Sequence, residues 1–214
     1  MREFTTRVAL ASALAAAVRD ALQTRLARDG KASLAVSGGT TPALFLDHLA
    51  REKLDWARVT ITLVDDRCVP ESSDRSNVRL VKEHLLQHEA AAARFVPLAA
   101  GQDQAIAPLL PFAAVLLGMG HDGHTASLFP GGDNLAASLA GPRLIETMHA
   151  SGAPEPRVTL TLPTFLQTDF LALHIEGAAK RAVLATAETA GPVEQMPIRA
   201  VLAHRPRAQI FWCP

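Results

Sequence analysis

The chain has 214 residues, of which 49% are hydrophobic and 20% are charged, so it can bury a substantial core and is not a disordered protein. It carries 21 basic and 21 acidic residues, and this zero net charge excludes an overall field that would hold a nucleic acid or an acidic membrane. Two cysteines cannot form a disulfide framework, and no apolar run reaches 18 residues. We therefore expect a soluble, cytoplasmic protein with no nucleic-acid or membrane partner.

Helical and strand-like patterns alternate from one end of the chain to the other. The predicted helices are 8–28, 43–51, 75–88, 178–188 and 197–203, and the predicted strands are 33–36, 59–64, 112–117, 157–162, 170–175 and 208–213. Segment 131–156 is rich in glycine and proline and is expected to be a loop without strands. This alternation predicts an α/β fold, with a mostly parallel sheet covered by helices on both faces. No linker divides the chain, so we expect one domain over residues 1–214.

Ligands of such sheets bind beyond the carboxyl ends of the strands, and the first loop there holds Ser37, Gly38, Gly39 and Thr40. Two glycines permit a close approach of the backbone, and hydroxyls and free N–H groups at a helix start suit an anionic oxygen. The alternative is a tight turn with a capping threonine.

A second loop begins with Asp65, Asp66 and Arg67 at the end of a predicted strand. The carboxylates are suited to orienting a polyol and the guanidinium to clamping a phosphate, although a simple ion pair within the loop is an equal alternative. For Ser76 a capping role at the start of the next helix is the better interpretation.

The third loop, residues 118–130, follows a strongly apolar strand and contains Gly120, Asp122, Gly123 and His124. Its G-x-G-x-x-G spacing matches a dinucleotide fingerprint, but the acidic residue that should end a second strand about 20 residues later is missing. A histidine in such a loop is suited to general base catalysis near neutral pH, and Asp122 could fix its tautomer. His121 is interpreted as structural, and the lack of a third ligand argues against a metal site.

Two cationic residues complete the candidates. Lys180 lies in the first turn of a predicted helix, where a cation is unfavourable unless an anion neutralises it. Arg157 opens a predicted strand. For both residues, phosphate binding and a surface position are nearly equal alternatives.

Taken together, these segments resemble the 6-phosphogluconolactonase family. The matching pieces are 37–42, 65–70 with 74–77, 118–130, 157–163 and 177–180, and the string Gly-Met-Gly-His-Asp-Gly-His-Thr-Ala-Ser-Leu-Phe-Pro is the most specific of them. The resemblance implies a fold shared with glucosamine-6-phosphate deaminases and sugar-phosphate isomerases. It also implies hydrolysis of 6-phospho-D-glucono-1,5-lactone in the pentose phosphate pathway without a cofactor. The neutral charge and the alanine-rich helices are compatible with a monomer or a homodimer.

By the same resemblance, His124 is the base that activates water, and Arg67 and Lys180 hold the 6-phosphate. The family commonly has glutamate at position 66, so the shorter Asp66 leaves its contact with the sugar open. The oxyanion is expected either at the Gly38–Gly39 turn or at the Gly120–Gly123 turn.

Two other functions compete with lactone hydrolysis. An amino-sugar phosphate deaminase would continue the Gly-His stretch with an Asn-Glu-Pro-type string, whereas this chain continues with Thr125-Ala-Ser-Leu-Phe-Pro130. A sugar-phosphate sensor without turnover would need a DNA-binding segment, for which the chain has neither spare residues nor a basic face.

Overall fold

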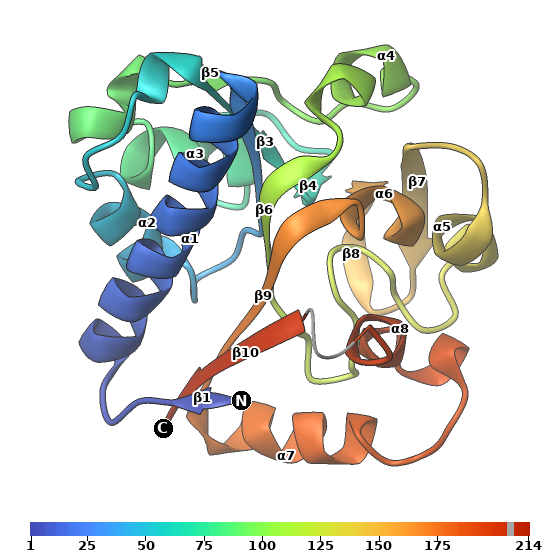
Figure 1. The fold of residues 1–214 in the computed structure, drawn as a ribbon. Coiled ribbons are helices and arrows are strands. Elements are labelled where there is room, and N and C mark those ends of the chain that lie inside the picture. The colour runs from blue at the N-terminus through green and yellow to red at the C-terminus, as the bar shows by residue number, and fades with distance from the viewer. Residues whose placement is uncertain (205–207) are drawn as a thin grey trace.

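In the computed structural model, which describes residues 1–204 and 208–214, a seven-stranded sheet runs through the middle of the molecule (Figure 1). Its described strand pairs are all parallel. From edge to edge the strands are β1 (Arg2–Glu3), β10 (Ala208–Cys213), β9 (Thr168–Glu176), β6 (Phe112–Leu117), β2 (Ala32–Val36), β3 (Val59–Leu63) and β5 (Arg94–Phe95). The central strands β2 and β6 are wholly buried, as expected of apolar strands covered on both faces. The expected mostly parallel sheet is confirmed.

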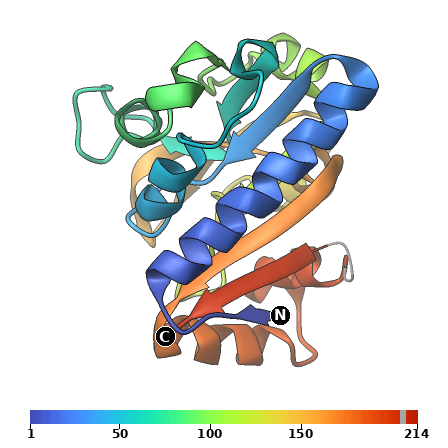
Figure 2. The same cartoon turned by 60° about the vertical axis from the view of Figure 1, so that its left-hand side comes forward.

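Helices cover both faces of this sheet. The longest, α1 (Arg7–Asp29), lies across one face beside α2 (Ala43–Leu49), as Figure 2 shows from the side of α1. It begins where the Thr6 side chain accepts a hydrogen bond from the amide of Ala9 at 3.1 Å, and it ends at Gly30, which adopts φ +72°. The other helices are α3 (Asn77–His84), α4 (Asp103–Ile106), α5 (Leu135–Ala140), α6 (Leu162–Phe165), α7 (Gly177–Ala187) and α8 (Ile198–Leu202). None of the described helices has the length and apolarity that crossing a membrane requires.

A second sheet corrects the prediction for segment 131–156. Instead of a strandless loop, this segment holds α5 and β7 (Ile145–Ala150), and β8 (Ala153–Leu160) begins within it. With β4 (Asp65–Arg67), these strands form a three-stranded antiparallel sheet in the order β4-β8-β7. The two prolines at the start of β8 obscure this strand in the sequence, because proline is rare inside strands.

Two predicted boundaries also move. The predicted strand 157–162 ends at Leu160, because the chain turns there into α6, which begins at Leu162. The predicted helix 75–88 is shorter, and α3 begins at Asn77 after Ser76, whose hydroxyl accepts a hydrogen bond from the amide of Arg79 at 3.3 Å. The capping role predicted for Ser76 is confirmed.

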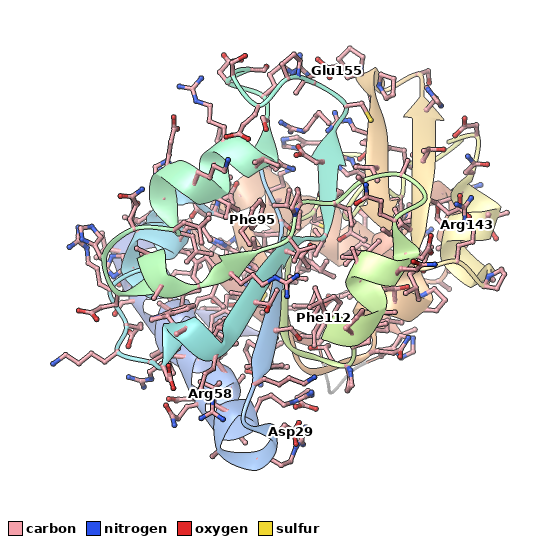
Figure 3. All side chains as sticks on the ribbon, turned by 90° about the horizontal axis from the view of Figure 1, so that it is seen from above. Asp29, Arg58, Phe95, Phe112, Arg143 and Glu155 are labelled. Carbon is pink, nitrogen blue, oxygen red and sulfur yellow. The ribbon has the colours of Figure 1, made fainter. Side chains whose placement is uncertain are left out.

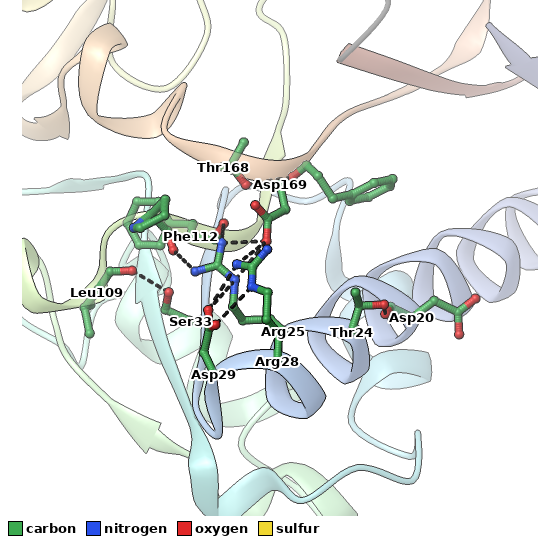
Figure 4. A network of polar contacts seen from close by, with 12 residues as sticks. Asp20, Thr24, Arg25, Arg28, Asp29, Ser33, Leu109, Phe112, Thr168 and Asp169 are labelled. Carbon is green, nitrogen blue, oxygen red and sulfur yellow. Dashed lines mark hydrogen bonds and ion pairs between the residues drawn. The ribbon is translucent and has the colours of Figure 1, made fainter.

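At the amino ends of the strands, a buried arginine ties α1 to the sheet (Figure 4). Arg25 donates to the carboxylate of Asp169, which precedes the buried part of β9, with its Nε at 2.8 Å. It also donates to the backbone carbonyls of Pro111 at 2.7 Å and Phe112 at 3.3 Å. These contacts hold α1 against β6 and β9 from the side opposite to the functional loops.

Candidate active site

A cavity of about 440 Å³ lies at the carboxyl ends of β2, β6 and β9, between the two sheets. Most of the residues singled out in the sequence line it: Ser37, Gly38, Gly39, Thr40, Arg67, Gly120, His124, Arg157 and Lys180. The parallel sheet explains this assembly, because consecutive strands end at the same edge and deliver their loops to one place. Three candidates lie outside the lining, and they are Asp66, Asp122 and Gly123.

Asp122 holds the imidazole of His124. Its Oδ1 is 2.6 Å from Nδ1 of His124 and accepts the backbone amide of the same residue at 3.1 Å. Burial by itself would raise the pKa of Asp122, but the hydrogen bonds and charge of His124 prevail and lower the pKa to about 2. An ionised carboxylate only accepts hydrogen bonds, so Nδ1 carries the proton and Nε2 is the basic atom of the neutral ring.

Glycines make this arrangement possible. A Cβ on Gly120 would lie 2.1 Å from Nδ1 of His124, so a larger residue would displace the imidazole. Gly123 adopts φ +79° and shapes the turn from outside the cavity, where its carbonyl accepts the amide of Ile198 at 2.9 Å. Helix α8 therefore supports the loop that carries His124.

The loop after β2 is tied to the loop after β6 by the hydroxyl of Ser37. This hydroxyl donates to the carbonyl of Leu116 at 2.8 Å and accepts the amide of Gly118 at 3.0 Å. Gly39 adopts φ +88°, and a Cβ on Gly38 would meet the side chain of Asn77 at 1.8 Å. Among the described residues, the amides of Gly38 and Gly39 donate to no protein acceptor, so they remain open to an anionic oxygen.

The two carboxylates of β4 have different surroundings. Asp65 and Arg67 line the cavity, whereas Asp66, between them, projects to the other side, as alternation along a strand requires. The carboxylate of Asp66 accepts the amides of Arg67 at 2.7 Å, Asn77 at 2.8 Å and Val78 at 3.4 Å. Burial raises the pKa of Asp66, and these amides oppose the shift. Asp66 therefore contacts the start of α3 and lies outside the cavity lining.

Arg67 and Arg157 form a cationic pair on the cavity wall. Nε of each is buried and finds no hydrogen-bond partner among the described residues. Glu155 lies near the tip of the β7–β8 hairpin (Figure 3). It approaches Arg157 only to 3.9 Å and pairs instead with Arg75 at 2.7 Å. Burial and the charge of Arg67 both lower the pKa of Arg157. Two adjacent guanidinium groups with free donors are suited to an anion.

Lys180 approaches the cavity from the first turn of α7, as predicted. Its Nζ donates to the carbonyl of Met119 at 2.7 Å. Burial lowers the pKa of Lys180, and the negative charge of Asp122 opposes this shift. Lys180 therefore lies on the side of the loop that carries His124.

Within residues 1–204 and 208–214, no three His, Cys, Asp or Glu side chains are grouped to hold a metal ion.

Comparison with known proteins places this chain in a protein family. The family model of glucosamine-6-phosphate isomerases and 6-phosphogluconolactonase matches residues 5–212. The chain belongs to this family. The resemblance drawn from the sequence motifs is thereby confirmed.

Relatives within the family align over nearly the whole chain. A 6-phosphogluconolactonase of Rhizobium meliloti is 49% identical, and the alignment covers 100% of this chain and 98% of that protein. The crystal structure of a 6-phosphogluconolactonase from Shewanella baltica is 40% identical, with a TM-score of 0.95 over 100% of this chain and 97% of the other. A monomeric glucosamine-6-phosphate deaminase shares the fold at 18% identity and a TM-score of 0.76, covering 99% and 96% of the two chains.

Phe129, His174 and Glu176 line the cavity but were not among the candidates drawn from the sequence. The ring centroid of Phe129 is 4.3 Å from that of the His124 imidazole and 5.6 Å from the guanidinium carbon of Arg157. The imidazole and the guanidinium are therefore at most about 10 Å apart. His174 and Glu176 line the cavity from the end of β9. Two polar residues, two positions apart at the end of an apolar strand, were the signal that could have found them, since such residues share a face.

Proposed function

We propose that this member of the family hydrolyses 6-phospho-D-glucono-1,5-lactone to 6-phospho-D-gluconate in the oxidative pentose phosphate pathway, with residues 1–214 acting as one domain. The observation that carries the proposal is the pairing of His124 with Asp122 beside a cavity whose wall holds two under-compensated arginines. A base near one end and an anion site within about 10 Å of it match a six-carbon lactone that carries a phosphate on C6.

In the first step, Nε2 of His124 accepts a proton from a water molecule as the water oxygen bonds to C1 of the lactone. The carbonyl oxygen becomes an oxyanion. Asp122 stabilises the imidazolium that forms, because its carboxylate is ionised and already bonded to Nδ1. In the second step, the oxyanion re-forms the carbonyl as the bond between C1 and the ring oxygen breaks, and the imidazolium returns the proton to the ring oxygen. The carboxylic acid that results loses its proton to the solvent and gives 6-phosphogluconate. The steps consume one water and need no cofactor.

The oxyanion is best received by the turn at Gly38 and Gly39. Its amides have no protein acceptor among the described residues, whereas the amide of Gly120 is occupied by the carbonyl of His124 at 2.8 Å and that of Gly123 by the carbonyl of Gly120 at 3.3 Å. Each such donor typically contributes about 3 kcal/mol to the stabilisation of an oxyanion transition state.

The phosphate is assigned to Arg67 and Arg157, with Lys180 as a third cation. A dianion placed between the two guanidinium groups would satisfy the buried Nε donors and remove their mutual repulsion. Binding energy from this remote group orients the lactone ring against His124, which is how non-reacting parts of a substrate contribute to the rate.

The test is a coupled assay near neutral pH, in which glucose 6-phosphate and its dehydrogenase generate the lactone and its decay is followed. Wild-type protein should accelerate the decay over the spontaneous reaction, and His124→Ala should lose roughly 10²–10⁴-fold of the rate. His149→Ala is the matched control, because His149 also bonds an aspartate, Asp133, through Nδ1 at 2.9 Å, but on the exposed surface.

The possible results separate function from mechanism. Acceleration that survives in His124→Ala would keep lactone hydrolysis and remove His124 as the base. No acceleration by the wild type would contradict the proposed function, and glucosamine 6-phosphate would then be the next substrate to test.

A further inference from the structure

Two carboxylates line the described part of the cavity wall, Asp65 and Glu176, and they differ in how their oxygens are occupied. Asp65 is buried, and its Oδ2 accepts the hydroxyl of Ser127 at 2.6 Å. Glu176 ends β9, and 14% of its side chain is exposed. Glu176 is therefore the cavity carboxylate that a ligand can reach more easily.

Two neighbours hold Glu176 in a fixed position. Oε1 is 3.1 Å from Nε2 of the buried His174, and Oε2 accepts Nε of Arg7 at 2.5 Å. The imidazole of His174 packs edge-on against Phe45, with centroids 6.4 Å apart, so its orientation is constrained. Each carboxylate oxygen has two acceptor directions, and one partner at each oxygen leaves a second direction unused.

Glu176 is also kept as an anion. Burial alone would raise its pKa, but the hydrogen bond and charge of His174, together with Arg7, lower the pKa below the usual range. An ionised carboxylate repels a phosphate and accepts hydrogen bonds from hydroxyl groups, so its chemistry selects the neutral, hydroxylated part of a sugar phosphate.

The two arginines of the cavity lie on a different sheet from this carboxylate. Arg67 is on β4 and Arg157 is on β8 of the antiparallel sheet, whereas Glu176 ends β9 of the parallel sheet. One part of the wall is thus suited to the phosphate and another to its uncharged hydroxyls.

We propose that Glu176, held by His174 and Arg7, recognises a ring hydroxyl of the substrate and determines which phosphorylated lactones this chain accepts. The inference rests on the proposed function, because it takes a phosphorylated sugar lactone as the ligand. Charge-assisted hydrogen bonds of this kind correspond to about a 10- to 100-fold preference for the hydroxylated substrate over the analogue that lacks the hydroxyl.

The experiment compares kcat/KM for 6-phosphogluconolactone and for its 2-, 3- and 4-deoxy analogues, each prepared from the corresponding aldose 6-phosphate. The wild type should prefer the parent lactone over at least one analogue by about 10- to 100-fold. Glu176→Gln should lose most of that preference, chiefly through slower turnover of the parent, while its rate on the discriminating analogue changes little. Glu176→Asp, which keeps the charge but is shorter, should retain part of the preference, and it serves as the second variant if Glu176→Gln fails to fold.

Glu52→Gln is the matched control, because Glu52 is also a partly buried carboxylate paired with an arginine, Arg19, at 3.1 Å, outside the cavity. It should leave every preference unchanged. Equal losses on all four lactones in the Glu176 variants, or no loss at all, would overturn the inference while leaving lactone hydrolysis intact. A wild type that hydrolyses none of the four would instead contradict the proposed function itself.

Discussion

Arg25 and Arg157 lie at opposite ends of the parallel sheet and are almost equally buried, with 7% and 8% of their side chains exposed, yet their bonding differs. Arg25, at the amino ends of the strands, donates to a carboxylate and to two backbone carbonyls (Figure 4). Arg157, at the carboxyl ends, has a carboxylate no nearer than 3.9 Å, a buried Nε without a partner among the described residues, and Arg67 as a like-charged neighbour.

The difference separates a cation whose charge is compensated within the protein from one whose charge is not. Burying a guanidinium costs free energy that only hydrogen bonds and opposite charge offset. That offset is built into the protein at Arg25, whereas at Arg157 the proposed function assigns it to the phosphate of the substrate. The same contrast applies to histidine pairs, since His149–Asp133 lies on the surface and His124–Asp122 lies at the cavity.

The largest effect on turnover is expected when the pair of Asp122 and His124 at the cavity is broken. Asp122→Asn should lower kcat by roughly 10²–10⁴-fold with a smaller change in KM, because the amide favours the wrong tautomer of His124 and cannot stabilise the imidazolium. Asp133→Asn removes the equivalent partner of His149 and should leave kcat unchanged. Steady-state kinetics on the lactone measure both variants, and equal effects would remove the distinction between the two pairs.

The two buried arginines should respond oppositely to the same substitution. Arg157→Met should reduce kcat/KM about 100-fold, mainly through KM, while the melting temperature stays the same or rises, because an uncompensated charge is removed. Arg25→Met should leave the kinetic constants unchanged and cost about 2–3 kcal/mol of stability, or about 5–10 °C in Tm for a chain of this size. A kinetic defect in Arg25→Met, or a large loss of Tm in Arg157→Met, would contradict the comparison.

Lys180 is the third cation, and its loss should have a smaller effect. Lys180→Ala is expected to raise KM roughly 10-fold and to lower kcat much less, since a single charge-assisted contact to the phosphate is lost. Lys82→Ala, which breaks an exposed pair with Glu71 at 2.6 Å, is the control. A fall in kcat with unchanged KM would move Lys180 from the phosphate to the reacting end, beside Asp122.

Much of the cavity could be predicted because it follows from the parallel topology. Ser37 and His124 lie in loops that follow β2 and β6, and Lys180 lies in the first turn of the helix that follows β9. The sequence predicts each of them at the carboxyl end of a strand, where parallel strands bring such segments together. Glycine spacing also indicated the turn that carries His124. Predictions of this kind need only the order of strands and helices.

What was missed depended on pairing between distant strands. Neither β4 nor β7 is apolar enough to be recognised alone, and β8 contains two prolines, so the antiparallel sheet was not foreseen. Without β4, the alternation that separates Asp66 from the cavity residues Asp65 and Arg67 was hidden. Likewise, the spacing of His174 and Glu176 places both on one face of β9, but which face meets the cavity depends on how β9 packs in the fold.

The smallest expected effect concerns stability in acid and again contrasts a paired with an unpaired group. The pKa of Asp122 is lowered to about 2 in the folded chain, below its ordinary value of 3.8. A carboxyl group with a depressed folded pKa stabilises the fold at pH values above its unfolded pKa, and this contribution is lost as the pH falls toward the folded pKa. Wild type should therefore exceed Asp122→Asn in Tm at pH 5, and the difference should shrink between pH 4 and pH 2. Because 46% of the Asp122 side chain is exposed, solvent screening keeps the difference small.

Thermal unfolding of wild type and Asp122→Asn between pH 5 and pH 2 is the measurement, with Asp133→Asn as the surface comparison. A difference that stays constant from pH 5 to pH 2 would show that the charge of Asp122 contributes nothing to the fold, and that its pairing with His124 serves the cavity alone.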